Sequence, residues 1–164
     1  MLRPDFIRHW TELENDDDDH RYKGHAELFS IRTPLARKLG LKRIGINHDR
    51  LPPGRRTSYP HAESMQEEFV FVLEGTPDVW IDGELHRLTP GDSVAFPPGT
   101  GICHSFLNNT ARDVRLLVIA EPHKAENRIR YPMNEAHEAI LADRWINWPK
   151  PPLGGHDGMP KRNA

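Results

Sequence analysis

Residues 68–96 read EFVFVLEGTPDVWIDGELHRLTPGDSVAF, and this stretch decides the fold. β-branched and aromatic side chains fill residues 68–75 and favour a strand. Asp82 and Gly83 follow between two strand-like arms, where a type I′ turn needs positive φ at both central positions. TPGD then turns the chain into another short strand, SVAF. Short strands joined by tight turns in this way predict an all-β fold.

Similar strands are predicted on both sides of this stretch. They are expected over residues 25–31, 41–51, 104–108 and 114–120. The second of these places Ile44, Ile46 and His48 on one face. About eight strands with turns between them form one continuous all-β region, residues 24–121, and such spacing is typical of a sandwich or a closed barrel.

The two ends of the chain have different patterns. The acidic run at 16–19 repels itself and favours a solvated loop. Asn134 is a candidate N-cap for a short helix on the outside of the barrel. The tail is rich in Pro and Gly and should be extended, with GGHDG at 154–158 exposed and flexible, or alternatively a lid. We therefore expect an N-terminal segment (1–23), one domain (24–121), and a C-terminal helix and arm (122–164).

Composition narrows the classes of partner. The formal net charge of −2 provides no basic field that would attract nucleic acid or an anionic membrane. The single cysteine, Cys103, cannot form an internal disulfide and is expected to be small, buried and unreactive. The first residues lack the apolar run of a signal peptide, and no stretch approaches the roughly 20 apolar residues of a membrane span. We expect a cytoplasmic protein that binds a small molecule.

Four side chains form the candidate site. His61 and Glu63 are two apart and should share one face of an extended strand. Glu68 begins the next strand and can approach them across a turn, and His104 lies on a later strand that could fold back alongside. Imidazole nitrogens and carboxylate oxygens are ligands that Fe, Mn, Ni and Zn accept as divalent ions. Glu67 should face the solvent, on the opposite side of the strand from Glu68.

Two segments, residues 54–75 and 91–108, resemble the two motifs of the cupin superfamily. In the first motif His61 matches the first histidine, and Glu68, six residues and then Gly75 match its end. The second motif is matched by Gly91, Pro97, Gly99, His104 and Asn108. The resemblance implies a jelly-roll barrel, also called a double-stranded β-helix. Residues 60–92 also resemble a group of short single-domain bacterial cupins without a settled activity, some of which carry the label sugar phosphate isomerase.

Two positions depart from the motifs. Glu63 stands where the family has its second histidine, and four residues rather than two separate Gly99 from His104. The resemblance implies a divalent metal, Mn, Fe, Ni or Zn, held by His61, Glu63, Glu68 and His104. The alternative is a metal-free pocket in which His61 and Glu68 carry protons as catalytic residues, as in cupins that resemble epimerases. Asn108 is expected to hydrogen-bond a turn and not to act as a ligand.

Three functions stay open at this point. The first is a metal-dependent isomerase, dioxygenase or decarboxylase acting on a small anionic molecule, such as a sugar phosphate or an organic acid. The others are a non-catalytic binding module and a metal-free epimerase-like enzyme. Arginine binds carboxylate or phosphate in a bidentate way, so Arg43, Arg55 and Arg56 are candidate substrate ligands, with surface ion pairing as the alternative. Cupin barrels commonly pair through a strand edge, and dimerisation removes an unpaired edge. We therefore predict a homodimer.

Overall fold

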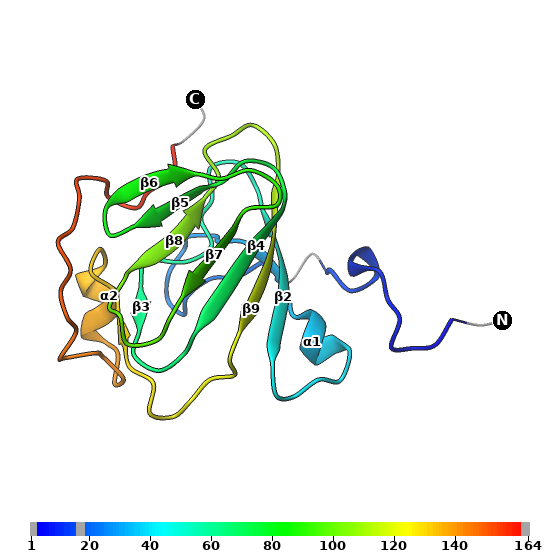
Figure 1. Ribbon diagram of the computed structural model, residues 1–164, viewed down its shortest axis with the longest axis horizontal. Coiled ribbons are helices and arrows are strands. Elements are labelled where there is room, and N and C mark those ends of the chain that lie inside the picture. Colours follow the sequence, from blue (N-terminus) through cyan, green and yellow to red (C-terminus); the bar gives the residue numbers. More distant parts are fainter. Residues whose placement is uncertain (1–2, 16–18, 162–164) are drawn as a thin grey trace.

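Two antiparallel sheets face each other and enclose the interior of the barrel (Figure 1). The structure is a computed structural model that describes residues 3–15 and 19–161, so the acidic run lies largely outside the described residues. The larger sheet has five strands in the order β1 (Ile31–Thr33), β2 (Gly45–Leu51), β9 (Val114–Ala120), β4 (Glu68–Glu74) and β7 (Ser93–Phe96). The predicted all-β fold is confirmed.

The second sheet carries His104, one of the four candidate site residues. Its three main strands, in order, are β6 (Glu84–Arg87), β5 (Asp78–Ile81) and β8 (His104–Leu107). Bridges from Arg56 to Leu107 and from His61 to His104 lay residues 56–61 along β8. The chain then enters β3 (Ala62–Glu63), which pairs with β10 (Ile129–Arg130). His61 and Glu63 therefore lie beside His104, whereas Glu68 lies on β4 of the larger sheet.

The turn between β5 and β6 has the predicted geometry. Asp82 and Gly83 have φ values of +46° and +93°, which are the two positive angles that a type I′ turn requires. Ile81 and Glu84 pair directly across it. The local sequence therefore sets the register of this hairpin.

The apolar core lies between the two sheets, on the inward face of each strand. On β4, Val70 and Val72 are 1% exposed, whereas Phe69 lies on the outer face and is 38% exposed. The core consists of Leu51, Val70, Val72, Val79, Phe96, Phe106, Val114, Leu116 and Val118. These residues gather toward one end of the barrel interior. At that end β4 and β9 pair Val72 with Leu116, whereas four residues away along β4 the same strands pair Glu68 with Ala120.

The strands nearest the N-terminus are shorter than predicted. Strand β1 begins only at Ile31, and β2 begins at Gly45. The prediction of strands over 25–30 and 41–44 is therefore wrong. The first of these segments serves side-chain packing instead, since Phe29 is fully buried in an aromatic cluster with Tyr59 and Tyr131. The second segment, residues 41–44, follows the short helix α1 (Leu35–Lys38) and a turn at Gly40, whose φ is +86°.

The N-terminal segment covers the outside of the larger sheet. A 3-10 turn, η1 (Trp10–Glu12), places the Trp10 ring 4.5 Å from the His48 ring in a stacked arrangement. His48 is consequently only 2% exposed although it lies on the outer face of β2. The apolar cluster around Trp10 therefore serves packing.

The C-terminal segment packs on the smaller sheet (Figure 1). Helix α2 (Glu135–Ala139) is capped by Asn134, whose side chain accepts a hydrogen bond from His137 N, as predicted. The tail has no regular structure from 149 to 161, but it is held in place: Trp80 Nε1 donates to the His156 carbonyl at 2.8 Å. Gly154, Gly155 and Asp157 are exposed, as predicted, but the backbone of this segment is hydrogen-bonded to the β5–β6 turn, which does not agree with the predicted flexibility. Among the described residues, no helix has the length and apolar character needed to cross a bilayer.

Candidate functional site

A cavity of about 240 Å³ occupies the end of the barrel interior that the apolar core leaves open. Both sheets contribute to its walls. The polar side chains that line it include His61, Glu63, Glu68, His104, Arg32 and Tyr131. The four predicted site residues thus line one cavity. Its volume is smaller than the roughly 300 Å³ at which drug-sized pockets begin, so it suits a small polar molecule.

His61 is fixed by a backbone contact. Its Nδ1 lies 2.9 Å from the Tyr59 carbonyl oxygen, which can only accept a hydrogen bond. Burial, and then the neighbouring His104, lower the pKa of His61 to about 4, so the ring is neutral near pH 7. A neutral ring that donates from Nδ1 carries its lone pair on Nε2. His61 therefore presents an acceptor nitrogen to the cavity.

Glu68 and His104 are in direct contact from opposite sheets. His104 Nε2 lies 3.3 Å from Glu68 Oε1, and the Phe96 ring stacks on the imidazole at 3.5 Å between centroids. Burial alone would raise the pKa of Glu68, but the hydrogen bond and charge of His104, with smaller contributions from His61 and Arg32, reverse this and lower it. Glu68 is therefore an ionised carboxylate at neutral pH.

Glu63 has the opposite electrostatic environment. Burial, and then the charge of Glu68, raise its pKa from the ordinary 4.5 to about 7, although a hydrogen bond from the Asn127 side chain opposes the shift. Glu63 therefore keeps its proton to a higher pH than Glu68 does. The cavity holds one carboxylate and one carboxylic acid, and two such groups with separated pKa values are typical of acid–base sites.

The predicted metal centre is not formed as a set. Among residues 3–15 and 19–161, no three His, Cys, Asp or Glu side chains are grouped so that they could hold a metal ion. Of the four, only Glu68 and His104 share a side-chain hydrogen bond, the His61 and His104 rings lie 4.9 Å apart between centroids, and a carboxyl such as Glu63 must lose its proton before it can ligate. As arranged, these residues do not fit a divalent ion. Metal binding by the four side chains stays a prediction.

An arginine that the sequence analysis missed lines the cavity. Arg32, on β1, donates from Nε and Nη2 to the two carboxylate oxygens of Asp49 at 2.8 to 3.1 Å. Asp49 is fully buried and also accepts a hydrogen bond from Ser30 Oγ at 2.9 Å. The alternation of inward and outward side chains along β2 could have revealed this ion pair. Asp49 lies two residues before the inward-facing Leu51, so it should also face inward, and a buried carboxylate needs a cationic partner.

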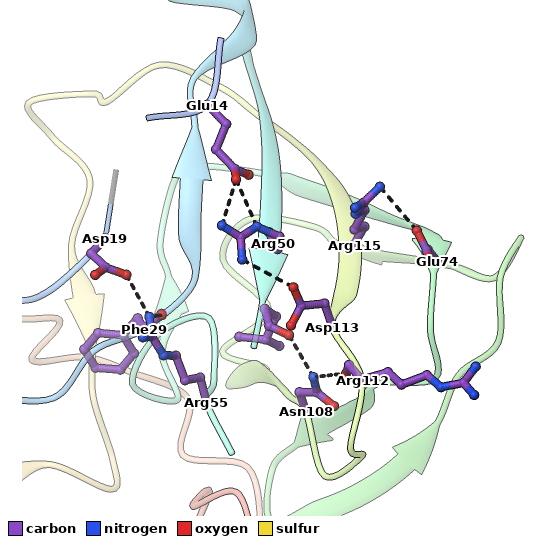
Figure 2. Close-up of polar contacts among 11 residues, drawn as sticks. Glu14, Asp19, Phe29, Arg50, Arg55, Glu74, Asn108, Arg112, Asp113 and Arg115 are labelled. Carbon is purple, nitrogen blue, oxygen red and sulfur yellow. Dashed lines mark hydrogen bonds and ion pairs between the residues drawn. The ribbon is translucent and has the colours of Figure 1, made fainter. Parts of the chain in front are cut away.

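The predicted arginines are placed elsewhere. Arg55 Nη1 donates to Asp19 at 2.7 Å and to the Phe29 carbonyl at 3.1 Å (Figure 2). Arg56 is 4% exposed and donates to Glu27 and to the Gly158 carbonyl. Neither side chain lines the cavity. Arg43 lines another hollow, of about 420 Å³, which Glu67 also borders and which shares Glu68 and Ala120 with the cavity. Their roles as substrate ligands stay predictions.

Three other residues behave as predicted. Glu67 is exposed. Cys103 is fully buried, and burial raises the pKa of its thiol, which makes the thiolate form inaccessible near neutral pH. Asn108 holds the turn before β9, since its Nδ2 donates to the Leu51 and Arg112 carbonyls at 2.7 Å, and Figure 2 shows the contact with Arg112.

The fold and the cavity together define a class: a small two-sheeted β-barrel with a polar chamber at one end of an apolar interior. Residues 47–120 match the family model of the cupin domain. Residues 47–120 therefore carry a cupin domain, and the chain has structural neighbours in the cupin superfamily. A comparison with proteins of curated function found no match.

Solved structures extend the likeness beyond the matched segment. A protein from Silicibacter pomeroyi named as a sugar phosphate isomerase of the cupin superfamily is 29% identical over 72% of this chain and 80% of its own, with a TM-score of 0.59. A candidate sugar phosphate isomerase from Acidithiobacillus ferrooxidans is 27% identical, with a TM-score of 0.60, over 63% of this chain and 65% of its own length. The polyketide cyclase RemF from Streptomyces resistomycificus is 19% identical over 87% of this chain and 96% of its own, with a TM-score of 0.63, and shows the fold alone.

Proposed function

We propose that the protein is a cupin enzyme that moves a proton within a small anionic molecule, an isomerase or epimerase type of reaction. The observation that carries this proposal is the pair of carboxyl groups in the cavity. Glu68 has a lowered pKa and Glu63 has a pKa raised to about 7. Two carboxyls in one enclosed space, one ionised and one partly protonated, provide a base and an acid at the same pH.

The roles follow from these protonation states. The Glu68 carboxylate accepts the proton from a carbon next to a carbonyl group, while Glu63 donates its proton to the carbonyl oxygen, which gives an enediol. Glu63 then takes a proton from the neighbouring hydroxyl group, and Glu68 returns its proton to the adjacent carbon. No net proton is gained or lost. His104 orients Glu68 through the contact at 3.3 Å, and the Nε2 of His61 accepts a hydrogen bond from a substrate hydroxyl group.

Two comparisons support an isomerase over a dioxygenase or a decarboxylase. Both proteins whose names refer to sugar phosphate isomerase are below 30% identical to this chain, so their names support the reaction class and do not fix a substrate. Removal of a proton next to a carbonyl group needs only an acid and a base, and the cavity provides both.

Metal binding is a second candidate, supported by the orientation of His61. A histidine that donates its Nδ1 proton to a backbone carbonyl presents Nε2 in the way that metal-ligating histidines do. A bound divalent ion would polarise the substrate carbonyl. To bind one, the four side chains would have to rearrange, since no three of them are grouped around one point among the described residues.

Proton exchange into solvent tests the proposal. The protein is incubated with ribose 5-phosphate or glucose 6-phosphate in deuterated buffer, with and without a chelator, and the signal of the proton next to the carbonyl group is followed by NMR. We expect the signal to be lost with the wild-type protein, in either condition, and to persist with the Glu68→Gln variant. Exchange that stops on chelation would favour the metal candidate, and equal exchange in both proteins would exclude Glu68 as the base.

A further inference from the structure

Arg32 lies where two hollows of the protein meet. The inner cavity and an outer groove of about 600 Å³ share three lining residues, His20, Arg32 and Asn47. Arg37 and His123 also line the groove, and both are exposed. A molecule that spans the two hollows therefore passes beside the guanidinium group of Arg32.

The guanidinium is fixed along one edge and open along the other. Its Nε and Nη2 are held by the fully buried carboxylate of Asp49, which Ser30 also contacts. Within the described part of the chain, Nη1 has no hydrogen-bond acceptor. Because the guanidinium is planar and rigid, the ion pair with Asp49 sets the direction in which Nη1 points. Arg32 is thus a donor oriented in advance, with a side chain that is 32% exposed.

The surroundings favour a phosphate group over a carboxylate. Asp49 offsets the charge of Arg32, so attraction for an anion depends on several donors acting together. Asn47 and His20 offer donors at the same place, and Arg37 adds positive charge to the groove. The groove's carboxylate, Asp19, is already paired with Arg55 at 2.7 Å. A phosphate monoester has three terminal oxygens and close to two negative charges, which matches several convergent donors better than a carboxylate does.

We propose that Arg32 binds the phosphate group of a phosphate monoester at the junction of the two hollows, with the carbon chain directed toward Glu68. This inference rests on the proposed function and names its substrate class. Of the residues that position the phosphate, Arg32 contacts it directly, and Asp49 acts through Arg32 as a positioning residue.

Binding of a phosphate that cannot react tests the proposal apart from catalysis. Glycerol 3-phosphate has no carbonyl group, so it cannot undergo the proposed proton transfer. Its affinity is measured by isothermal titration calorimetry for the wild type and for the double variant Arg32→Gln/Asp49→Asn, which removes both charges and leaves neither group buried without a partner. We expect the double variant to bind at least about tenfold more weakly, the effect of losing one charged hydrogen bond. Malate is the carboxylate counterpart, and glycerol is the neutral one.

Arg50→Gln is the matched control. Arg50 is also a strand arginine paired with carboxylates, but it contacts Glu14 and Asp113 on the outer face of β2 (Figure 2). We expect this variant to bind glycerol 3-phosphate within about twofold of the wild type. Equal affinity of the double variant and the wild type, with folding verified by thermal melting, would overturn the assignment to Arg32. No binding of glycerol 3-phosphate by the wild type, or tighter binding of malate, would overturn phosphate as the ligand.

Failure of this inference and failure of the proposed function give different results. If Glu68→Gln stops proton exchange while the Arg32 double variant keeps its affinity for glycerol 3-phosphate, the enzyme assignment stands and the phosphate site is wrong. If the double variant loses affinity while Glu68→Gln exchanges like the wild type, the phosphate site stands and the acid–base assignment is wrong.

Discussion

The two ends of the barrel interior are built from the same strands but from opposite kinds of side chain. At one end the inward positions are Val72 on β4 and Leu116 on β9, which pair with each other and are at most 1% exposed. At the other end the same two strands pair Glu68 with Ala120 beside the polar cavity. A distance of four residues along β4 separates a packed core from a site with an ionised carboxylate.

The difference shows where the stability and the function of the barrel reside. Apolar burial contributes about 25 cal/mol for each Å² removed from water, so the Val72–Leu116 end stabilises the fold. The cavity end buries polar groups, which destabilises a protein unless they are paired. His104 Nδ1 is buried there without a hydrogen-bond partner among the described residues. Such a cost is typical of a functional site.

Truncation at the apolar end should have the largest effect on stability. Leu116→Ala removes a fully buried side chain and leaves a cavity, so we expect a loss of about 2–5 kcal/mol in the free energy of unfolding, measured by urea denaturation. Leu73→Ala is the matched control, because Leu73 is 43% exposed on the outer face of β4, and it should lose about 1 kcal/mol or less. Similar losses for the two variants would mean that the core is not at this end.

Loss of a charge at the polar end should come next, and it should be reversible by a second change. Arg32→Gln leaves the Asp49 carboxylate buried and unpaired, so we expect a loss of about 2–3 kcal/mol, somewhat less than for a fully buried pair. The added change Asp49→Asn should restore most of that stability in the same urea measurement. A double variant that is no more stable than the single one would show that packing of Arg32, and not its charge, is what matters.

The raised pKa of Glu63 predicts a smaller, pH-dependent effect. The unfolded chain loses the Glu63 proton near pH 4.5 and the folded protein only near 7, so this carboxyl makes folding less favourable as the pH rises between these values. Glu63→Gln removes the effect. We expect the variant to be more stable than the wild type by about 1–2 kcal/mol at pH 8 and unchanged at pH 4, by thermal melting. The exposed Glu67→Gln should follow the wild type at both pH values, and a gain for Glu63→Gln at pH 4 would refute the ionisation as its cause.

A change outside both ends should have the smallest effect. Asn134→Ala removes the side-chain cap of α2, so we expect a loss of about 1 kcal/mol in stability with unchanged ligand affinity. Asn134→Asp, which retains a capping oxygen, is the control and should lose little. Altered affinity for glycerol 3-phosphate in Asn134→Ala would indicate that α2 is coupled to the cavity.

The sequence predicted the parts of the molecule that local chemistry determines. Asp82–Gly83 fixed the hairpin because a type I′ turn depends on only two residues, and Asn134 was identified because capping is equally local. The cavity residues His61, Glu68 and His104 were found through motif spacing, and they do line one cavity. Whether they bind a metal is not decided by spacing, because it depends on angles and protonation states that the fold imposes.

The parts that were missed depend on contacts between distant segments. Arg32 lies on a strand of only three residues, 36 positions before Glu68 in the sequence, and its role arises from its pairing with Asp49. The tail was predicted to be flexible from its Gly and Pro content, but the buried indole of Trp80 needs an acceptor and finds it in the His156 carbonyl. Gly and Pro content indicates how flexible a segment is by itself, but it does not reveal which distant residue will hold that segment in place.

Separate titration of the two cavity carboxyls tests the division of the site most directly. Protein labelled with ¹³C at the glutamate side-chain carboxyl is titrated by NMR, with Glu63→Gln and Glu68→Gln used to assign the signals. We predict that Glu63 titrates near pH 7 and Glu68 below its ordinary 4.5. A shared midpoint near 4.5 for both residues would contradict the acid and base roles proposed for this end of the barrel.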